Sequence, residues 1–200
     1  MQQREQRLNK NDVIDFFNQQ AAQWDEHMIR YDDVIEQIMD NARISEGKDI
    51  LDVACGTGVL IPDYLERRVK SVTAIDISPE MIHIAESKFQ QDNVQFICGD
   101  VEKTVFPKQF DCIMIYNAFP HFENQKGLIE YLGGMLKEGG TLSVAHGMSR
   151  ERINKCHAGI AAKVSLGLIS EEELAGYFTP HLEVLVKKSD DKMYQVVGRK

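Results

Sequence analysis

Apolar runs that alternate with helical patterns constrain the fold of this chain more than any other feature. From Asp49 on, the segments DILDVAC, SVTAID, NVQFICGD, FDCIMIYNAF and GTLSVAHG are typical of strands, and helical segments follow four of them. This alternation predicts a doubly wound α/β fold, in which a mostly parallel sheet carries helices on both faces. Near the C-terminus, LEVLVKK and KMYQVVGR predict an antiparallel pair that closes the sheet.

The first 46 residues have a different pattern, because they contain no strand-like run. Apolar residues recur there at helical spacing: Val13, Phe16, Phe17, Val34, Ile35, Ile38 and Met39. We expect two or three helices joined around Trp24, the first of them capped by Asn11 or Asp12. The sequence therefore predicts an N-terminal helical cap or lid over residues 1–46 and one compact domain over residues 47–200.

Charge and cysteine content narrow the classes of partner. The net charge of −8 argues against a nucleic-acid partner, whose phosphates attract clustered Lys and Arg. The polar N-terminus lacks the apolar core of a signal peptide, and no apolar run approaches the roughly 18 residues of a membrane span. Four cysteines without a CxxC pair indicate reduced thiols. We expect a cytoplasmic protein with a small-molecule substrate; the oligomeric state stays open.

The stretch ILDVACGTGVL, residues 50–60, predicts a strand that ends in a ligand-binding loop. Gly56 and Gly58 allow a tight turn and let a ligand approach the backbone, and a helix expected near Val59 offers free N–H groups. The third glycine of a dinucleotide-binding GxGxxG would fall at Ile61, so a pyrophosphate is not favoured. A smaller ligand with a cationic part, attracted by Asp52, fits better.

Acidic residues follow the next two predicted strands. Asp76 ends the second strand, where a carboxylate can accept hydrogen bonds from the hydroxyls of a ribose. Gly99-Asp100-Val101 ends the third, where a carboxylate and a backbone N–H can together recognise adenine. Each acid alone also suits an ordinary turn or helix cap. Together, at the ends of successive strands, they predict a nucleoside site.

With these motifs in place, the chain resembles the class I S-adenosylmethionine-dependent methyltransferases of the small-molecule type. DVACGTG, AIDISPEMI, ICGDVE, IYNAFPHF and LKEGGTLSV resemble successive motifs of that family. The resemblance implies a Rossmann-like seven-stranded sheet with an antiparallel last strand, and S-adenosyl-L-methionine as cofactor, with S-adenosyl-L-homocysteine as its product. The residues that it places against this cofactor are Asp52, Gly56, Thr57, Gly58, Asp76, Ile77, Met81, Gly99, Asp100, Val101 and Asn117.

Polar residues after the fourth and fifth strands are the candidates for the acceptor side. His121 and His146 are candidate catalytic residues, since a neutral imidazole can take a proton at physiological pH. The candidates for substrate binding are Trp24, Tyr116, Arg150, Asn154 and His157. Of these, the last three share one face of a predicted helix, which can equally be a plain solvated face.

Two alternatives concern the same residues. Three imidazoles, those of His121, His146 and His157, can bind zinc or iron, but their spacing matches no ligand motif, so we expect no metal. Trp24 can close a lid over the acceptor or anchor the N-terminal helices to the sheet.

The leading interpretation is an enzyme that transfers a methyl group to a small molecule by in-line displacement, mainly through positioning of the reactants. The strand-4 end reads Asn117-Ala118-Phe119-Pro120, not the N/DPPY sequence of adenine or glutamine N-methylation. A domain that only senses S-adenosylmethionine or S-adenosylhomocysteine is the alternative from another class. An NAD-dependent oxidoreductase is a third, weaker interpretation. The sequence leaves the acceptor atom open.

Overall fold

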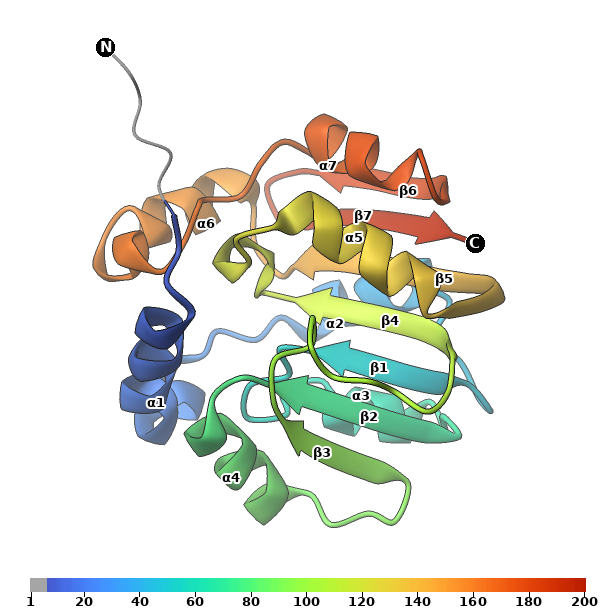
Figure 1. Cartoon of the computed structure of the whole chain (residues 1–200), viewed down its shortest axis with the longest axis horizontal. Helices are drawn as coiled ribbons and strands as arrows, with labels where there is room; N and C mark the ends of the chain where they lie inside the picture. Colours follow the sequence, from blue (N-terminus) through green and yellow to red (C-terminus); the bar gives the residue numbers. More distant parts are fainter. Residues whose placement is uncertain (1–6) are drawn as a thin grey trace.

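The computed structural model describes residues 7–200 and has a seven-stranded sheet at its centre, in the order β3-β2-β1-β4-β5-β7-β6 (Figure 1). The strands are β1 (Asp49–Val53), β2 (Ser71–Asp76), β3 (Val94–Cys98), β4 (Phe110–Tyr116), β5 (Leu136–His146), β6 (Glu183–Ser189) and β7 (Tyr194–Arg199). The first five are parallel, and β7 lies antiparallel between β5 and β6. The predicted fold class and the antiparallel C-terminal pair are confirmed.

Helices cover both faces of the sheet and its carboxyl edge. They are α1 (Lys10–His27), α2 (Asp32–Asn41), α3 (Ile61–Glu66), α4 (Pro79–Lys88), α5 (Gln125–Gly134), α6 (Arg150–His157) and α7 (Glu171–Phe178), with 3-10 turns η1 (Phe119–His121) and η2 (Ile160–Lys163). In Figure 1, α5 and α7 lie in front of the sheet, while α2 and α3 lie behind it. Helices α1 and α6 lie at the left, beyond the carboxyl ends of the strands. None of the helices in the described part is long and apolar enough to cross a membrane.

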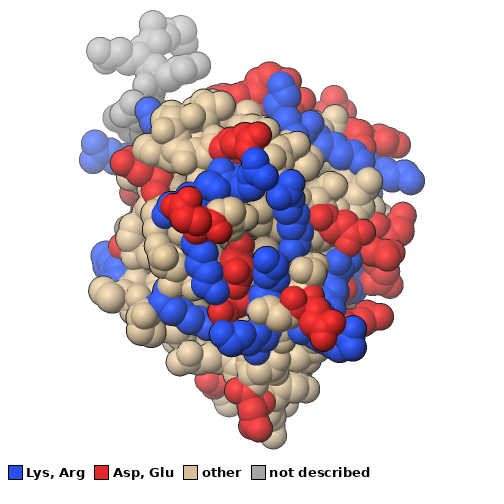
Figure 2. All heavy atoms as spheres, turned by 90° about the vertical axis from the view of Figure 1, so that its right-hand side faces the viewer, with Lys and Arg blue, Asp and Glu red and all other residues tan. Residues whose placement is uncertain are grey.

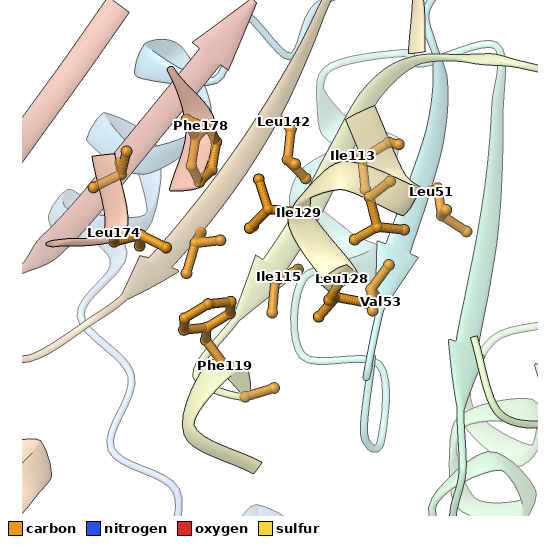
Figure 3. Packing of buried hydrophobic residues seen from close by; sticks show 14 of the residues in the cluster. Leu51, Val53, Ile113, Ile115, Phe119, Leu128, Ile129, Leu142, Leu174 and Phe178 are labelled. Atoms are coloured by element: carbon orange, nitrogen blue, oxygen red, sulfur yellow. The ribbon is translucent and has the colours of Figure 1, made fainter. Parts of the chain in front are cut away.

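Two apolar clusters hold these layers together. Because successive strand residues point to opposite faces, Leu51 and Val53 of β1 pack with α5 and α7, whereas Ile50 packs with α2 and α3. Figure 3 shows the first cluster, with Ile129 and Phe178 directed at the sheet. Full burial of each such side chain stabilises the fold by about 1.5–3 kcal/mol. The strands are thereby fixed, and their carboxyl ends present a rigid edge.

The N-terminal segment divides into two parts. Helix α2 buries its apolar residues in the core against the sheet. Helix α1 lies over the carboxyl edge and packs on α4. The expected helices are present, but α1 runs unbroken through Trp24 to His27, so the joint lies at residues 28–31; no Gly or Pro interrupts the helix at Trp24. Its cap is Asn9, which accepts a hydrogen bond from the N–H of Asn11 at 2.9 Å.

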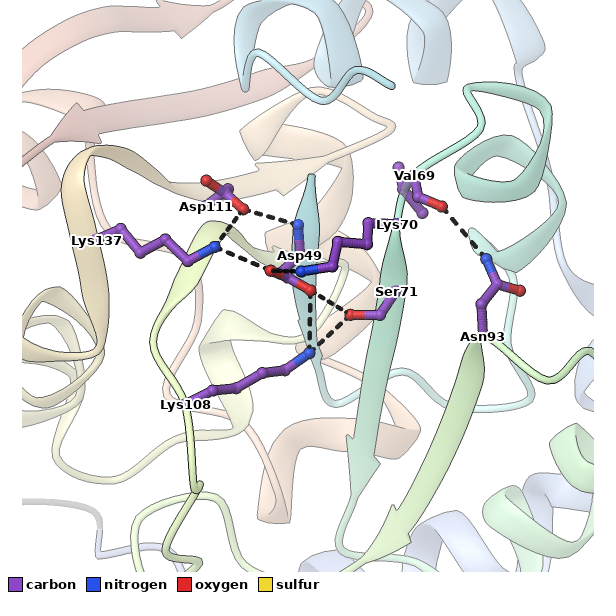
Figure 4. A network of polar contacts seen from close by, with 8 residues as sticks. All are labelled: Asp49, Val69, Lys70, Ser71, Asn93, Lys108, Asp111 and Lys137. Atoms are coloured by element: carbon purple, nitrogen blue, oxygen red, sulfur yellow. Dashed lines mark hydrogen bonds and ion pairs between the residues drawn. The ribbon is translucent and has the colours of Figure 1, made fainter. Parts of the chain in front are cut away.

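A charged network covers the opposite, amino edge of the sheet. Asp49 accepts hydrogen bonds from Lys137 at 2.9 Å, from Ser71 at 2.7 Å and from Lys108 at 3.2 Å (Figure 4). These partners hold the pKa of the buried Asp49 carboxyl well below its usual range. On this face Lys and Arg side chains surround acidic ones (Figure 2). The amino edge is therefore occupied by its own ion pairs, and the carboxyl edge holds the pocket described next.

Candidate active site

A pocket lies at the carboxyl ends of β1 to β4, under α1. Open parallel sheets bind ligands at this edge. Its lining includes Ala54, Cys55, Gly56, Ile75, Asp76, Ile77, Met81, Gly99, Asp100, Val101, Tyr116 and Asn117 from the sheet side. Leu8, Lys10, Val13, Phe17, Trp24 and Met28 close it from the N-terminal side, and Val59, Ala118, His121, Phe122 and Glu123 complete it. Eight of the eleven predicted cofactor residues thus line one pocket.

 Thr57 adjoins this wall through its neighbour Gly56. Asp52 and Gly58 lie behind it.

The two loop glycines have different roles. Gly56 has φ +56°, and a Cβ added there would point toward Trp24, whose Nε1 would lie 4.0 Å away across the pocket. A Cβ on Gly58, which has φ +83°, would instead meet the ring of Phe89 at 2.8 Å. Gly56 therefore keeps the backbone open to a ligand, while Gly58 lets the loop pack on the end of α4.

Backbone strain also gathers at this edge. Ala54 after β1 has φ +56°, and Asn117 after β4 has φ +55°, a left-handed conformation that non-glycine residues seldom adopt. Asn117 is fixed there because its Oδ1 accepts the N–H of Gly147 at 3.0 Å. Strained residues of this kind cluster where a ligand is held.

Asp76 organises the loop as well as facing the pocket. Its Oδ2 accepts the N–H of Gly56 at 2.9 Å, and its Oδ1 accepts the N–H of Ser78 at 2.9 Å. Burial raises the pKa of this carboxyl, although the two N–H donors act in the opposite direction. Each carboxylate oxygen can accept a second hydrogen bond, so the ribose-binding role predicted for Asp76 remains open to it.

Asp52 points away from the pocket. It shares its face of β1 with Ile50, so its side chain enters the helix layer that contains Tyr64 of α3. Its Oδ2 has no hydrogen-bond partner among the described residues. Burial, together with the nearby charge of Asp76, raises the pKa of Asp52 to about 8. Its predicted attraction for a cationic group therefore stays a prediction.

The end of β3 carries an ion pair that the sequence did not indicate. Lys10, the first residue of α1, donates to Asp100 Oδ2 at 2.7 Å and to Glu102 Oε2 at 2.6 Å. The ammonium group lowers the pKa of Asp100 against the opposing effect of burial. No local pattern marks Lys10, because its partners lie about 90 residues further along the chain. Asp100 is thus held ionised, with its side chain at the pocket.

Helix α1 is attached to the pocket rim at two further points. Asp25 accepts a hydrogen bond from Thr57 of the glycine loop at 2.5 Å and another from Lys88 of α4 at 2.7 Å. Ser78, after β2, donates to Asn18 at 2.7 Å. One helix therefore contacts the loops that follow β1, β2 and β3, and it encloses the space between them.

His121 forms the other end of the pocket. Its ring lies 5.0 Å from the ring of Phe17 and 5.0 Å from that of His157, measured between centroids. Its Nδ1 lies 2.7 Å from the carbonyl oxygen of Val164. Burial first, and then His157, lower the pKa of His121 to about 4. The ring is neutral at pH 7, next to the apolar side chains of α1.

His146, the other predicted catalytic residue, does not line the pocket. It follows Leu142 and Val144 on the face of β5 that packs with α7, and its ring meets that of Tyr194 at 6.0 Å. Both ring nitrogens are buried without a partner in the described part of the chain. Burial, and then His157 and His121, lower the pKa of His146 to about 3. It lies in the core, behind His121.

The predicted face of α6 binds the chain itself. Asn154 donates to the carbonyl of Leu168 at 3.0 Å and accepts its N–H at 2.6 Å, while Arg150 Nε donates to the same carbonyl at 3.0 Å. His157 Nδ1 lies 2.7 Å from the hydroxyl of Ser165. The spacing correctly grouped these residues, but none of the three lines the pocket. Trp24 and Tyr116, the other two substrate candidates, do line it.

Metal ligation finds no support in the described residues. No group of three or more His, Cys, Asp or Glu side chains within residues 7–200 has a geometry that could hold a metal ion. His121 instead contacts a backbone carbonyl and His157 a hydroxyl, while neither ring nitrogen of His146 has a polar partner among the described residues.

The sequence is similar to those of known methyltransferases. Residues 50–140 match a family model described as a methyltransferase domain. A malonyl-[acyl-carrier protein] O-methyltransferase of Priestia megaterium is 29% identical over 170 residues, which cover 82% of this chain and 61% of that protein. The protein of the same name in Acetivibrio thermocellus is 38% identical over 96 residues, or 48% of this chain and 34% of that one. The chain therefore spans less than two thirds of the length of these curated relatives.

Solved structures agree on the fold. A DhpI–SAH complex superimposes with a TM-score of 0.74 at 20% identity, and the match covers 94% of this chain and 95% of that one. The matched segment, residues 50–140, contains the glycine loop, the acids after β2 and β3, and the strained turn after β4. Residues 50–140 thus match a methyltransferase domain, and the strand order with its antiparallel β7 is the fold of the class I S-adenosylmethionine-dependent methyltransferases.

Proposed function

We propose that this chain transfers a methyl group from S-adenosylmethionine to a small-molecule acceptor held between the cofactor and His121. The observation that carries the proposal is the continuity of one pocket. It runs from Asp100 and the glycine loop, where an adenosyl group fits, to His121 and Phe17, where no cofactor residue is expected. A molecule bound at the far end would share this pocket with the cofactor.

The residues present fit the cofactor. The open Cβ direction of Gly56 suits an aminocarboxylate laid against the backbone, and Asp76 stands where ribose hydroxyls would reach it. Asp100 and Val101 would bind the adenine, and Ile77 and Met81 line the same pocket. Bound S-adenosylmethionine supplies an activated methyl group on a good leaving group. The protein's own contribution is then mainly alignment, which supplies about 7–11 kcal/mol in well-oriented reactions.

His121 is the residue that we assign to proton removal. Because a carbonyl oxygen only accepts hydrogen bonds, the contact with Val164 places the ring proton on Nδ1. Nε2 then carries a lone pair, has no partner among the described residues, and is not sealed in the core as the nitrogens of His146 are. A base in this position can take a proton from an acceptor hydroxyl or amine. His146 has no access to the pocket, so we assign it no catalytic role.

Helix α1 is the part of the predicted N-terminal cap that we assign to closing the site. It contributes Lys10, Val13, Phe17 and Trp24 to the pocket and excludes water from the reacting groups. We place α2 with the main domain, since its apolar face lies in the core.

Calorimetry tests the cofactor half of this proposal. Wild-type protein should bind S-adenosylmethionine and S-adenosylhomocysteine, and Gly56→Val should lose affinity because its side chain would fill the space facing Trp24. Gly134→Ala is the matched control, because a Cβ at that position meets nothing within 4 Å. Undiminished affinity in folded Gly56→Val would contradict the assigned site.

A sensor that binds both cofactor forms without turnover is the second candidate. A screen of acceptors for S-adenosylhomocysteine release distinguishes this sensor from an enzyme. The partly accessible, unpaired Nε2 of His121 favours the enzyme.

A further inference from the structure

The charges around the pocket bear on the kind of acceptor it can take. Lys10 is the one Lys or Arg among the described lining residues, against the acids Asp76, Asp100 and Glu123. Its ammonium group already donates to Asp100 and Glu102. The lining therefore offers no unpaired cation to a negatively charged acceptor, and its fixed charges are mostly negative.

Two arginines in segments beside the pocket have partners of their own. Arg30, two residues after the lining residue Met28, donates to Asp32 at 2.6 Å, to Asp63 at 2.6 Å and to the carbonyl of Val59 at 2.8 Å. All three of its nitrogens have partners. Arg150 of α6 donates through Nε to the backbone of Leu168 and lies outside the lining. Arg30 therefore has no nitrogen left for an acceptor carboxylate, and Arg150 is not among the residues that line the pocket.

His121 favours an acceptor group that donates a hydrogen bond over one that only accepts. Its Nδ1–H is used by Val164, so it offers the pocket a lone pair and no proton. A lone pair attracts an O–H or N–H group and repels a carboxylate oxygen. The rings of Phe17 and His157 pack against the imidazole, so it cannot turn easily to present Nδ1 instead.

The remaining walls at this end are apolar. Val13, Phe17 and Met28 come from the N-terminal side, and Ala118 and Phe122 from the turn after β4. An acceptor that replaces water here buries apolar surface, which favours binding by about 25 cal/mol per Å². A negatively charged group on the acceptor would have no unpaired cation to bind among the described lining residues.

We propose that the acceptor is a mainly apolar molecule without a negative charge that presents one O–H or N–H group to Nε2 of His121. This inference rests on the proposed function and narrows it to a class of substrate. The acceptor's lone pair forms the bond to the methyl carbon, and the carbon–sulfur bond breaks with its electron pair left on sulfur. The proton lost by the acceptor passes to Nε2 and is later released to solvent.

This class differs from the one suggested by the relatives' names. A malonyl group ends in a carboxylate, and the curated relatives from Priestia megaterium and Acetivibrio thermocellus are named for malonyl-[acyl-carrier protein]. They share with this chain the segment that holds the cofactor, which does not determine the acceptor. The acceptor end is built from α1 and η1, where charge and hydrogen-bonding capacity decide the substrate.

Two ligands of similar size test the proposal. Protein saturated with S-adenosylhomocysteine is titrated with 4-ethylphenol and with 4-ethylbenzoate, and the affinity and the His121 ring resonances are measured by NMR. We expect the phenol to bind about tenfold more tightly or better, since a buried carboxylate without a partner is costly. The phenol should also shift the His121 signal. His121→Phe should abolish the preference, while His181→Phe, distant on the surface, should retain it.

Equal or tighter binding of the benzoate overturns the proposal. So does the absence of a saturable His121 shift with the phenol. Saturation by S-adenosylhomocysteine is measured first and separately, so failure at that step refutes the proposed function and not the acceptor class. The same step shows that each variant is folded.

Discussion

The buried carboxyl of Asp52 gives the sharpest prediction about stability. The side chain is 2% exposed, its Oδ2 has no partner among the described residues, and its pKa is raised to about 8. Between its ordinary pKa of 3.8 and pH 8, the unfolded chain releases this proton while the folded chain keeps it. Unfolding is therefore favoured increasingly as the pH rises through this range.

Asp52→Asn removes the titration and keeps the shape. At 1.36 kcal/mol per pH unit, the free energy of unfolding should rise by about 2 kcal/mol at pH 5 and about 4 kcal/mol at pH 7. Urea denaturation at several pH values measures both numbers. The gain at pH 7 is a sizeable part of the 5–15 kcal/mol that typically stabilises a domain.

Asp111→Asn is the matched control. The ammonium of Lys137 at 2.7 Å lowers the pKa of Asp111, so this substitution should destabilise the protein at pH 7, and the loss should disappear as the pH falls below the ordinary pKa of a carboxyl. A gain in Asp52→Asn that does not change with pH would refute the reasoning. A loss of stability would show that the Asp52 carboxylate is paired in the native state.

Two further substitutions follow from the same structure. Lys10→Met should weaken S-adenosylhomocysteine binding by roughly tenfold in calorimetry, because it removes the ion pair that holds both α1 and Asp100 in place. Lys103→Met should have little effect, since the Lys103 side chain is 78% exposed and lies 3.6 Å from the same carboxylate. His146→Leu should stabilise the fold by about 1 kcal/mol at pH 7.5, since neither ring nitrogen has a partner among the described residues. That gain should grow by about 2 kcal/mol at pH 5, because the unfolded chain protonates His146 below its ordinary pKa of 6.5 and the folded chain does not, and urea denaturation again measures it.

The fold was largely predictable because its central strands are buried on both faces. A run such as Ile113 to Ile115 is apolar without alternation, which few structures other than a central parallel strand accommodate. Boundaries were less certain. The helix expected near Val59 begins at Ile61, because the turn that contains Gly58 occupies the residues between. Strand β5 begins at Leu136, earlier than expected, since Leu136 pairs with Phe110 across an irregular register.

The cofactor side of the site was predictable for a related reason. Parallel strands bring their carboxyl ends to one edge, so residues that follow successive strands must meet there. What the sequence could not indicate is which contacts cross from α1. Thr57 with Asp25 and Asp100 with Lys10 join residues 32 and 90 positions apart. Such pairs depend on the direction in which α1 crosses the carboxyl edge of the sheet, and the spacing of residues in the sequence does not indicate that direction.

The three histidines show where prediction from residue type ends. His146 shares its face of β5 with Leu142 and Val144, so its ring enters the core, and the residue type alone does not record that direction. His157 shares a helix face with Asn154, and that face turned out to bind residues 165–168. His121 follows Asn117, whose left-handed backbone redirects the chain after β4 and brings η1 to the pocket. Chemically the three are equal. Their functions differ because the backbone sets where each ring points and which of its nitrogens is hydrogen-bonded. Of the three, we assign only His121 a lone pair that faces the pocket.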